Sequence, residues 1–281
     1  MNVSIVIPVY NEADQLGACL DAIARQTVTP LEVIVVDNNS TDNTVAVAHR
    51  YPFVEVLHEP KQGVLYARTT GFDAAKGDII ARIDADSLLP ENWVSSIQEV
   101  FNDRSIDAAS GVALYYNVAA AGIFNAIDLF FRRRLSWQLK DRVYLWGANM
   151  AMRRNAWQSV KSSLCWRGGM HEDYDLAIHL QEQGCRVAFD ERMRVRVSSR
   201  RIDVSYLDFM RYVWVSPGTY AQHRIRSRWH MYWVVLVCGV GYLPARMLHR
   251  GYDVTRNKFS LAQLFTAKRV VPRVDPTANV A

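Results

Sequence analysis

The sequence lacks several features that mark common protein classes. Its four cysteines, Cys19, Cys165, Cys185 and Cys238, lie far apart and form no CxxC pair. Neither a zinc motif nor a disulfide framework is therefore indicated, and a reducing compartment fits best. No GxGxxG follows an expected strand, which argues against a dinucleotide-dependent oxidoreductase. There is also no GxSxG elbow and no Cys/His catalytic signature, so no covalent nucleophile is expected.

The N-terminal segment lacks the basic start and the cleavage site of a signal peptide. It reads MNVSIVIPVYNE, which is typical of a first buried strand. We therefore expect a protein on the cytosolic side of the membrane. With 281 residues, 50% of them hydrophobic, the chain is long enough for one α/β domain with an appendage.

Positive charge is concentrated at one end of the chain. The net charge is +5, yet residues 192–281 hold 16 Lys and Arg against 4 Asp and Glu. A basic tail of this kind can bind nucleic acid or an anionic membrane surface. Within it, residues 229–245 carry no formal charge and are rich in aromatic and aliphatic side chains, with Arg228 and Arg246 on either side.

This uncharged stretch is short for a membrane span, which needs about 20 apolar residues. It can instead lie in the membrane interface with its Trp and Tyr rings near the headgroups, or form a buried helix of a soluble domain. An uncharged aromatic stretch is unusual in a tail that binds nucleic acid, so no nucleic-acid partner is expected. We expect a cytoplasmic protein bound peripherally to the inner face of the membrane.

The first half of the chain alternates short apolar runs with amphipathic stretches. This is the βαβ pattern of a mostly parallel sheet flanked by helices. Ser40 or Thr41 is the expected cap of the second helix. Strands are expected over residues 3–9, 31–36, 53–57 and 79–83, and helices over residues 12–26, from about 41 to 48, 64–75, 118–140 and 172–183.

Acidic residues follow two of the expected strands. Asp37 closes the second strand, and Asp84-Ala85-Asp86 follows the fourth. Open α/β sheets bind ligands at the carboxyl ends of their strands, so these acids lie where a nucleotide would bind. Carboxylates at positions i and i+2 suit Mg²⁺ or Mn²⁺ shared with phosphates. The simpler alternative is that Asp84 and Asp86 only cap and turn the chain.

Five motifs occur in order over roughly residues 1–195. They read VSIVIPVYNE, EVIVVDNNSTDNT, GVLYARTTGFDAAKGDIIARIDADSLLPENW, WGANMAMRR and HEDYDLAIHLQEQG. In this combination the chain resembles the family 2 glycosyltransferases, which have a GT-A fold. The resemblance implies that a sugar passes from a nucleotide-sugar donor to an acceptor hydroxyl with inversion, usually with bound Mg²⁺ or Mn²⁺.

The resemblance also implies roles for residues that match its donor-binding motifs. Tyr10 and Asp37 match the residues that hold the base, and Pro8 shapes the loop after the first strand. Asp84 matches a residue near the ribose. Asp86 matches the metal ligand.

The remaining matches concern the phosphates, the sugar and the acceptor. Arg68, on the helix before the acidic triplet, is expected to approach the phosphates. Glu172-Asp173 matches the acidic pair of the family, in which the second acid, here Asp173, is the general base and the pair belongs to the nucleotide-sugar site. Asn149 lies in the segment that lines the sugar and acceptor pocket.

Several polar residues have more than one interpretation. Glu12 can begin the first helix or contact the nucleotide, and the Arg200-Arg201 pair can neutralise a phosphate. His171, where the family commonly has Gly, is either a group beside the catalytic acid or a solvated loop histidine. His179 lies within a helical pattern and is expected to be structural.

Two other functions remain open. A nucleotidyltransferase would use a similar sheet, but a Gly- and Arg-rich loop would follow its first strand, where this chain has Tyr10-Asn11-Glu12. A catalytically inactive membrane-bound scaffold of the same fold would be expected to have lost the acids. We therefore predict a GT-A domain over residues 1–200, a helical membrane-associated region over residues 201–281, and a lipid-linked or cell-envelope glycan acceptor.

Overall fold

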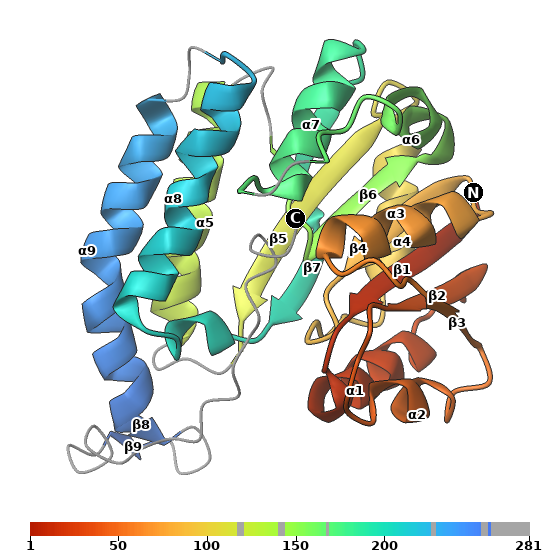
Figure 1. Ribbon diagram of the computed structural model, residues 1–281, viewed down its shortest axis with the longest axis horizontal. Helices are drawn as coiled ribbons and strands as arrows, with labels where there is room; N and C mark the ends of the chain where they lie inside the picture. The colour runs from red at the N-terminus through yellow and green to blue at the C-terminus, as the bar shows by residue number, and fades with distance from the viewer. Residues whose placement is uncertain (117–120, 140–143, 167–168, 226–228, 254–257, 260–281) are drawn as a thin grey trace.

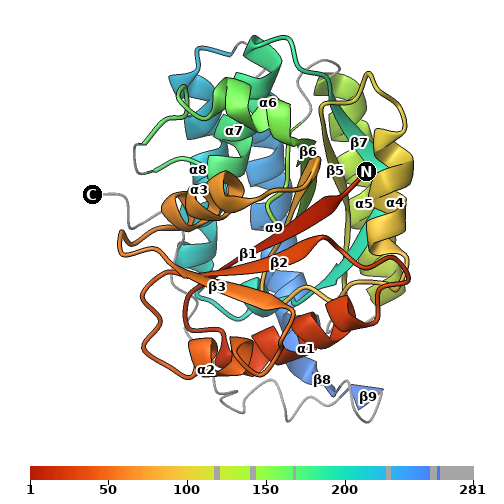
Figure 2. The same cartoon turned by 90° about the vertical axis from the view of Figure 1, so that its right-hand side faces the viewer.

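The computed structural model describes residues 1–116, 121–139, 144–166, 169–225, 229–253 and 258–259. Within them, one seven-stranded sheet has the order β3-β2-β1-β4-β6-β5-β7 (Figures 1 and 2). Its strands are β1 (Val3–Val9), β2 (Glu32–Asp37), β3 (Val54–His58), β4 (Ile79–Ile83), β5 (Ala108–Tyr115), β6 (Asn149–Arg153) and β7 (Val187–Val197).

The sheet is mostly parallel, as predicted. Strands β1 to β4 pair in parallel, and β5 pairs in parallel with β7. Only β6, among the strands of this sheet, runs antiparallel to its neighbours β4 and β5. The carboxyl ends of β1, β2 and β4 therefore meet at one edge.

Helices cover both faces of the sheet (Figure 2). One face packs against α1, α2 and α4, and the other against α3, α6 and α7. The described helices are α1 (Ala13–Ala24), α2 (Thr44–Ala48), α3 (Val64–Ala74), α4 (Trp93–Phe101), α5 (Ala121–Leu139), α6 (Arg154–Val160), α7 (Glu172–Glu182), α8 (Tyr206–Gln222), α9 (Trp229–Gly251) and the short 3-10 helix η1 (Arg200–Ile202).

The continuous apolar sequence of β1 follows from its burial on both faces. Ile5 and Ile7 point into the core under α1 and α4, while Val6 points into the core under α3. Helix α3 lies close to the sheet because Gly71 has no side chain: a Cβ there would lie 2.3 Å from Val6 Cγ1.

The predicted bounds of these elements agree with the structure to within two residues, with two exceptions. The second helix begins about three residues later than predicted, and the ends of the helix predicted over residues 118–140 lie outside the described residues. The predicted cap of α2 is wrong, because this helix begins at Thr44 and its N-cap residue is Asn43. Ser40 and Thr41 instead bind the loop after β1, where Ser40 Oγ accepts from the Asn11 N–H at 3.0 Å.

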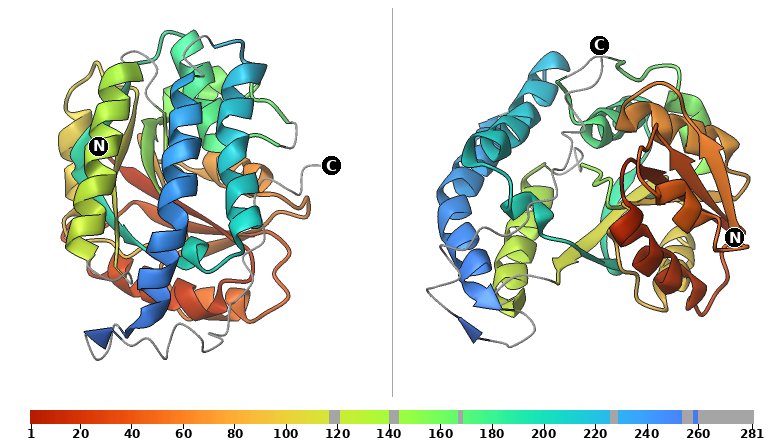
Figure 3. Two further views of the ribbon diagram at one scale, coloured as in Figure 1. Left: turned by 90° about the vertical axis from the view of Figure 1, so that its left-hand side faces the viewer. Right: turned by 60° about the horizontal axis from the view of Figure 1, so that its bottom comes forward.

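The C-terminal helices pack against the domain beyond the β5–β7 end of the sheet. Helices α5, α8 and α9 lie side by side there (Figures 1 and 3). Helix α9 is anchored through the Tyr242 hydroxyl, which donates to the Ile202 carbonyl at 3.0 Å, and through His249 Nε2, which lies 3.3 Å from Asp203 Oδ2. The short strands β8 (Tyr252–Asp253) and β9 (Lys258–Phe259) follow.

Candidate functional site

The predicted donor-binding residues lie on adjacent strand ends. The register pairs Pro8 with Val36 and Val9 with Asp37, so Tyr10 follows β1 next to the point where Asp37 closes β2. Asp37 is buried, accepts from the Ser40 N–H at 3.2 Å, and lies 3.4 Å from His58 Nδ1. Their expected roles in base binding stay predictions.

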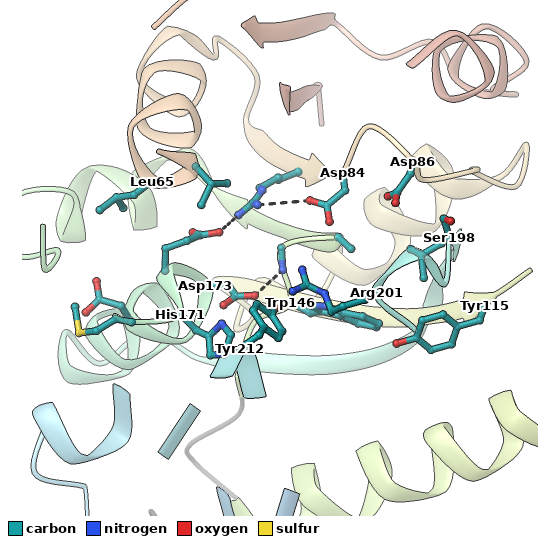
Figure 4. A pocket seen from close by; sticks show the side chains of 18 of the residues that line it. Leu65, Asp84, Asp86, Tyr115, Trp146, His171, Asp173, Ser198, Arg201 and Tyr212 are labelled. Atoms are coloured by element: carbon teal, nitrogen blue, oxygen red, sulfur yellow. Dashed lines mark hydrogen bonds and ion pairs between the residues drawn. The ribbon is translucent and has the colours of Figure 1, made fainter. Parts of the chain in front are cut away.

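One pocket at this edge combines residues from both halves of the chain. Figure 4 shows Asp84 and Asp86 on one side of it, and Asp173, Trp146 and Arg201 on the other. Its lining includes Arg82, Asp84, Asp86, Trp146, Gly147, Cys165, His171, Glu172, Asp173, Asp175, Arg201 and Tyr212. Because Arg201 and Tyr212 belong to the predicted C-terminal region, the two predicted regions share this pocket.

Asp86, the predicted metal ligand, is held by an arginine from the far end of the sheet domain. Arg200 Nη2 donates to Asp86 Oδ2 at 2.8 Å and to Glu12 Oε1 at 3.0 Å. Asp86 is buried, with a side chain 3% exposed. Glu12 is also the N-cap residue of α1, so it begins this helix, and its contact with the nucleotide stays a prediction.

A chain of buried charges joins α3, β4 and α7. Arg68 and Arg82 both donate to the Glu172 carboxylate, and Arg82 also lies 3.6 Å from Asp84 Oδ1. Burial alone would raise the pKa of Glu172, but the charges of Arg82 and Arg68 lower it below its usual value. Glu172 therefore remains ionised between the two guanidinium groups.

Gly147 makes room for this arrangement. A Cβ at Gly147 would lie 2.8 Å from the Arg82 guanidinium. Its N–H donates to Asp173 Oδ2 at 3.0 Å, so the segment before β6 contacts both the charge chain and the catalytic candidate (Figure 4).

Asp173 differs from its neighbour Glu172 in its contacts and in its pKa. Its carboxylate accepts from the backbone N–H groups of Gly147 and Tyr174, each at 3.0 Å, and among the described residues no ion pair holds it. Burial and the negative charge of Glu172 raise the pKa of Asp173 to about 7. A carboxyl group with this pKa can exchange a proton near neutral pH.

His171 is buried, which makes its interpretation as a solvated loop histidine wrong. Its ring centroid lies 4.7 Å from that of Tyr212, and its N–H donates to Thr219 Oγ1 at 3.0 Å. The Arg201 guanidinium stacks on the same Tyr212 ring, 3.5 Å from its centroid. Helix α8 thus contributes to the pocket wall through Tyr212.

Arg68 does not approach the pocket as predicted. The residue is fully buried, with Nη1 donating to the Glu172 carbonyl at 2.8 Å and the guanidinium 5.9 Å from the Trp157 ring centroid. The expected phosphate contact is therefore wrong, because this charge serves to hold Glu172.

Asn149 also lies behind the pocket wall. Its amide nitrogen donates to the carbonyl groups of Val112 and Met193 at 2.9 and 3.0 Å, and Oδ1 accepts from Trp93 Nε1 at 3.1 Å. The prediction that Asn149 lines the sugar pocket is wrong, because its side chain holds strands β5, β6 and β7 together. Trp146 and Gly147 of the same segment line the pocket instead.

The residues that sequence reasoning missed are Arg82, Trp146 and Tyr212. Arg82 left a signal, since it is the one charged residue in the apolar strand of residues 79–83. Trp146 also left one, since it opens the motif WGANMAMRR that was expected to line the pocket, whereas Tyr212 left none because only the folded chain brings it beside the acidic triplet.

Comparison with known proteins identifies the family. The sequence model described as "Glycosyl transferase family 2" matches residues 4–160. The chain belongs to this family. The glycosyltransferase AglE of Haloferax volcanii is 28% identical over 227 residues, which are 73% of this chain and 75% of AglE. The uncharacterized glycosyltransferase YibD of Escherichia coli is 33% identical over 110 residues, 38% of this chain but only 32% of YibD.

Solved structures share the fold. The mannosyltransferase PcManGT of Pyrobaculum calidifontis, solved with GDP-Man and Mn²⁺, superimposes with a TM-score of 0.64 at 20% identity, over 93% of this chain and 77% of PcManGT. Glucosyl-3-phosphoglycerate synthase of Mycobacterium tuberculosis, solved with Mn²⁺, UDP and phosphoglyceric acid, gives 0.56 at 19% identity over 80% of each chain. The chain of this family 2 member thus has the predicted GT-A fold.

The residues of this chain fit a hard divalent cation. Asp84 and Asp86 both line the pocket and offer only carboxylate oxygens, the ligands that Mg²⁺ and Mn²⁺ prefer. A cation at Asp86 has to share this carboxylate with Arg200, because the guanidinium already donates to it through Nε and Nη2.

The buried charge chain predicts a large stability effect. Glu172→Ala leaves Arg68 and Arg82 without their shared counter-charge, so we expect the free energy of unfolding to fall by about 3 to 5 kcal/mol. Lys161→Met, which breaks the exposed ion pair with Asp73, should change it by less than about 1 kcal/mol. Urea denaturation followed by circular dichroism measures both, and equal effects of the two variants would contradict the assignment.

Proposed function

We propose that this chain is an inverting glycosyltransferase that uses a nucleotide-sugar donor and a divalent metal ion. The observation that carries the proposal is the single pocket in which Asp84 and Asp86 face Asp173 (Figure 4). A donor needs its phosphates at the strand ends and its anomeric carbon next to a base. Asp84 and Asp86 lie where the phosphates would bind, and Asp173 lies where the base is needed.

The donor occupies the edge formed by β2, β1 and β4. Tyr10 stacks on the base, Asp37 accepts from it, and Pro8 shapes the loop between them. Asp84 binds near the ribose. The adjacent pairing of β1 with β2 and β4 supports this order, because it brings the three strand ends together.

Asp86 is the proposed ligand for Mg²⁺ or Mn²⁺. When bound, such an ion supplies Lewis-acid stabilisation to the charge that develops on the diphosphate leaving group. Arg200 and Arg201 add fixed positive charge near the same phosphates. Their positions, one bonded to Asp86 and the other in the pocket wall, support this role.

Asp173 is the proposed general base. It removes the proton from the acceptor hydroxyl while the oxygen attacks the anomeric carbon from the side opposite the leaving nucleoside diphosphate. A single displacement of this kind inverts the anomeric centre. The Gly147 N–H orients the Asp173 carboxylate. The negative charge of the neighbouring Glu172 raises the pKa of Asp173.

We further propose that α8 and α9 hold the enzyme on the cytoplasmic face of a membrane, where a lipid-linked or envelope glycan acceptor would be presented. Helix α9 is long and apolar enough to span a bilayer by length and composition, with a mean hydropathy of 1.4, and only 17% of its apolar window is buried. Its inward stripe, Met231, Val235, Tyr242 and His249, packs on the protein.

The opposite stripe of α9 is apolar and exposed. Trp229, Trp233, Val240 and Met247 are each at least 59% exposed, and Trp214 of α8 is 59% exposed beside them. One face bound to protein and one apolar face toward the outside favour a helix that lies in the membrane interface over one that spans it.

The metal role predicts the behaviour of Asp86→Asn. Loss of the carboxylate should lower metal-stimulated release of nucleoside diphosphate by a factor on the order of 10² to 10³, since stabilisation of the leaving group is lost. The measurement is a screen of nucleotide-sugars with Mg²⁺ or Mn²⁺, and the exposed Asp103→Asn is the matched control. Full turnover by Asp86→Asn would contradict the proposed role of Asp86 as a metal ligand.

The raised pKa of Asp173 predicts a pH profile. A general base acts when deprotonated, so kcat/KM should rise with pH to a plateau, with the midpoint of the rise near 7. Asp173→Asn should lose about 10²- to 10⁴-fold in kcat/KM and lose this rise. A wild-type profile without a rise in this region would show that Asp173 is not the titrating base.

The exposed stripe of α9 predicts membrane binding that depends on single residues. Trp233→Ser should weaken binding to anionic liposomes in cosedimentation by about 10- to 100-fold, because roughly 1.5 to 3 kcal/mol of apolar burial is lost. Leu31→Ser, at a 50% exposed position outside the helical layer, is the control and should bind as the wild type does. Equal binding by Trp233→Ser and wild type would count against interfacial attachment.

A further inference from the structure

A second group of metal-ligand side chains lies between α7 and the end of α8. It consists of Cys165, Asp175, His179 and His223. One sulfur, one carboxylate oxygen and two imidazole nitrogens all lie within 4.8 Å of one another. We propose that these four residues form a structural zinc site whose ligands differ from the proposed metal ligand Asp86, and this proposal does not rest on the proposed function. Two of them, Cys165 and Asp175, also line the pocket described above.

The separations between ligand atoms fit a tetrahedral zinc ion. Cys165 Sγ lies 3.7 Å from His179 Nε2, which lies 3.5 Å from Asp175 Oδ1. Zinc bonds of about 2.0 to 2.3 Å separate neighbouring ligand atoms in a tetrahedron by roughly 3.3 to 3.8 Å. His223 Nε2 lies 2.8 Å from Asp175 Oδ1, so this pair has to open by less than about 1 Å, and the remaining pairs all lie within 4.8 Å.

Further contacts orient the proposed ligands. His179 Nδ1 lies 3.1 Å from Glu182 Oε2, which leaves Nε2 directed at the cluster. Asp175 Oδ2 accepts from the Cys165 N–H at 3.0 Å, which leaves Oδ1 directed at both histidines. A carboxylate behind a metal-binding histidine is a common feature of zinc sites, because it fixes the ring and raises its basicity.

The backbone also explains why the four side chains converge. Asp175 and His179 are four residues apart on α7, so they lie on one face of the helix. Cys165 belongs to the segment between α6 and α7, and His223 directly follows α8. A metal ion here would fasten the C-terminal helices to the helix that begins with Glu172 and Asp173.

The charge balance favours a dication over an empty hydrogen-bonded group. The Asp175 side chain is 1% exposed and that of His223 is 7% exposed. A zinc ion with a Cys165 thiolate, the Asp175 carboxylate and two neutral imidazoles has no net charge, which suits a site with little solvent. The thiol proton leaves to solvent when zinc binds, so affinity falls as pH falls.

The donor set also selects the type of metal. Sulfur and imidazole ligands favour zinc and related transition metals, whereas Mg²⁺ and Mn²⁺ prefer oxygen. Four protein ligands close a tetrahedral site and leave no position for a substrate, so a structural role follows. Because the ligands come from residues 165, 175, 179 and 223, no short zinc motif marks them in the sequence.

Metal analysis of the full chain tests the proposal without any donor or acceptor. The protein is produced with zinc in the medium, freed of any histidine tag and purified without chelator. We expect about one zinc per chain by mass spectrometry, a lower melting temperature after chelation, and a thiolate-to-metal absorption band after replacement with Co²⁺.

Matched variants locate the site. Cys165→Ser and His223→Gln should each lose the zinc, and Cys165→Ser should also lose the Co²⁺ band. The controls Cys185→Ser, at a similarly half-buried cysteine, and His49→Gln, at an exposed histidine, should keep both.

Two results would overturn the proposal. One is wild-type protein that holds no zinc after incubation with the ion and melts at the same temperature with and without chelator. The other is zinc retained by both ligand variants. If the ligand variants do not fold, the chelation and Co²⁺ measurements on the wild type still decide. The metal sought at Asp86 gives no thiolate band, so the two sites cannot be confused.

Discussion

The bridging of Glu172 by two buried arginines is the interaction on which the rest of the site depends. Arg68 comes from α3 and Arg82 from β4, and both donate to the first residue of α7. Isolated buried charges are costly, so each of the three requires the others. The helix is thereby fixed against the sheet at the point where the acidic triplet leaves β4.

The same interaction sets the chemistry of the neighbouring residue. Because Arg68 and Arg82 keep Glu172 ionised, Asp173 has a permanent negative charge next to it. That charge and the burial of Asp173 raise the pKa of its carboxyl group, whereas Glu172 is lowered. Two adjacent acids of one motif thus have opposite pKa shifts, one as the centre of an ion-pair group and the other as the proposed proton acceptor.

Sequence reasoning found what local patterns determine. The strand over residues 79–83 and the acids after it could be predicted, because the pattern of consecutive apolar residues indicates a buried strand and where it ends. The roles of Arg68 and Asn149 were wrong, since their partners Glu172 and Met193 lie 104 and 44 residues away. A motif gives the identity of a side chain, but only the packing of distant elements decides whether that side chain faces a ligand or the scaffold.

Helical geometry explains how α7 serves three purposes within two turns. Successive side chains on a helix point about 100° apart, so Glu172 can face the buried arginines while Asp173 faces the pocket. Asp175 lies about 200° further round, away from Asp173, and His179 follows one turn later on nearly the same side. These two therefore meet Cys165 and His223, and Asp175 and Cys165 also reach the wall of the pocket. One helix can hold the charge chain, orient the proposed proton acceptor and attach the C-terminal helices, because its side chains point in different directions.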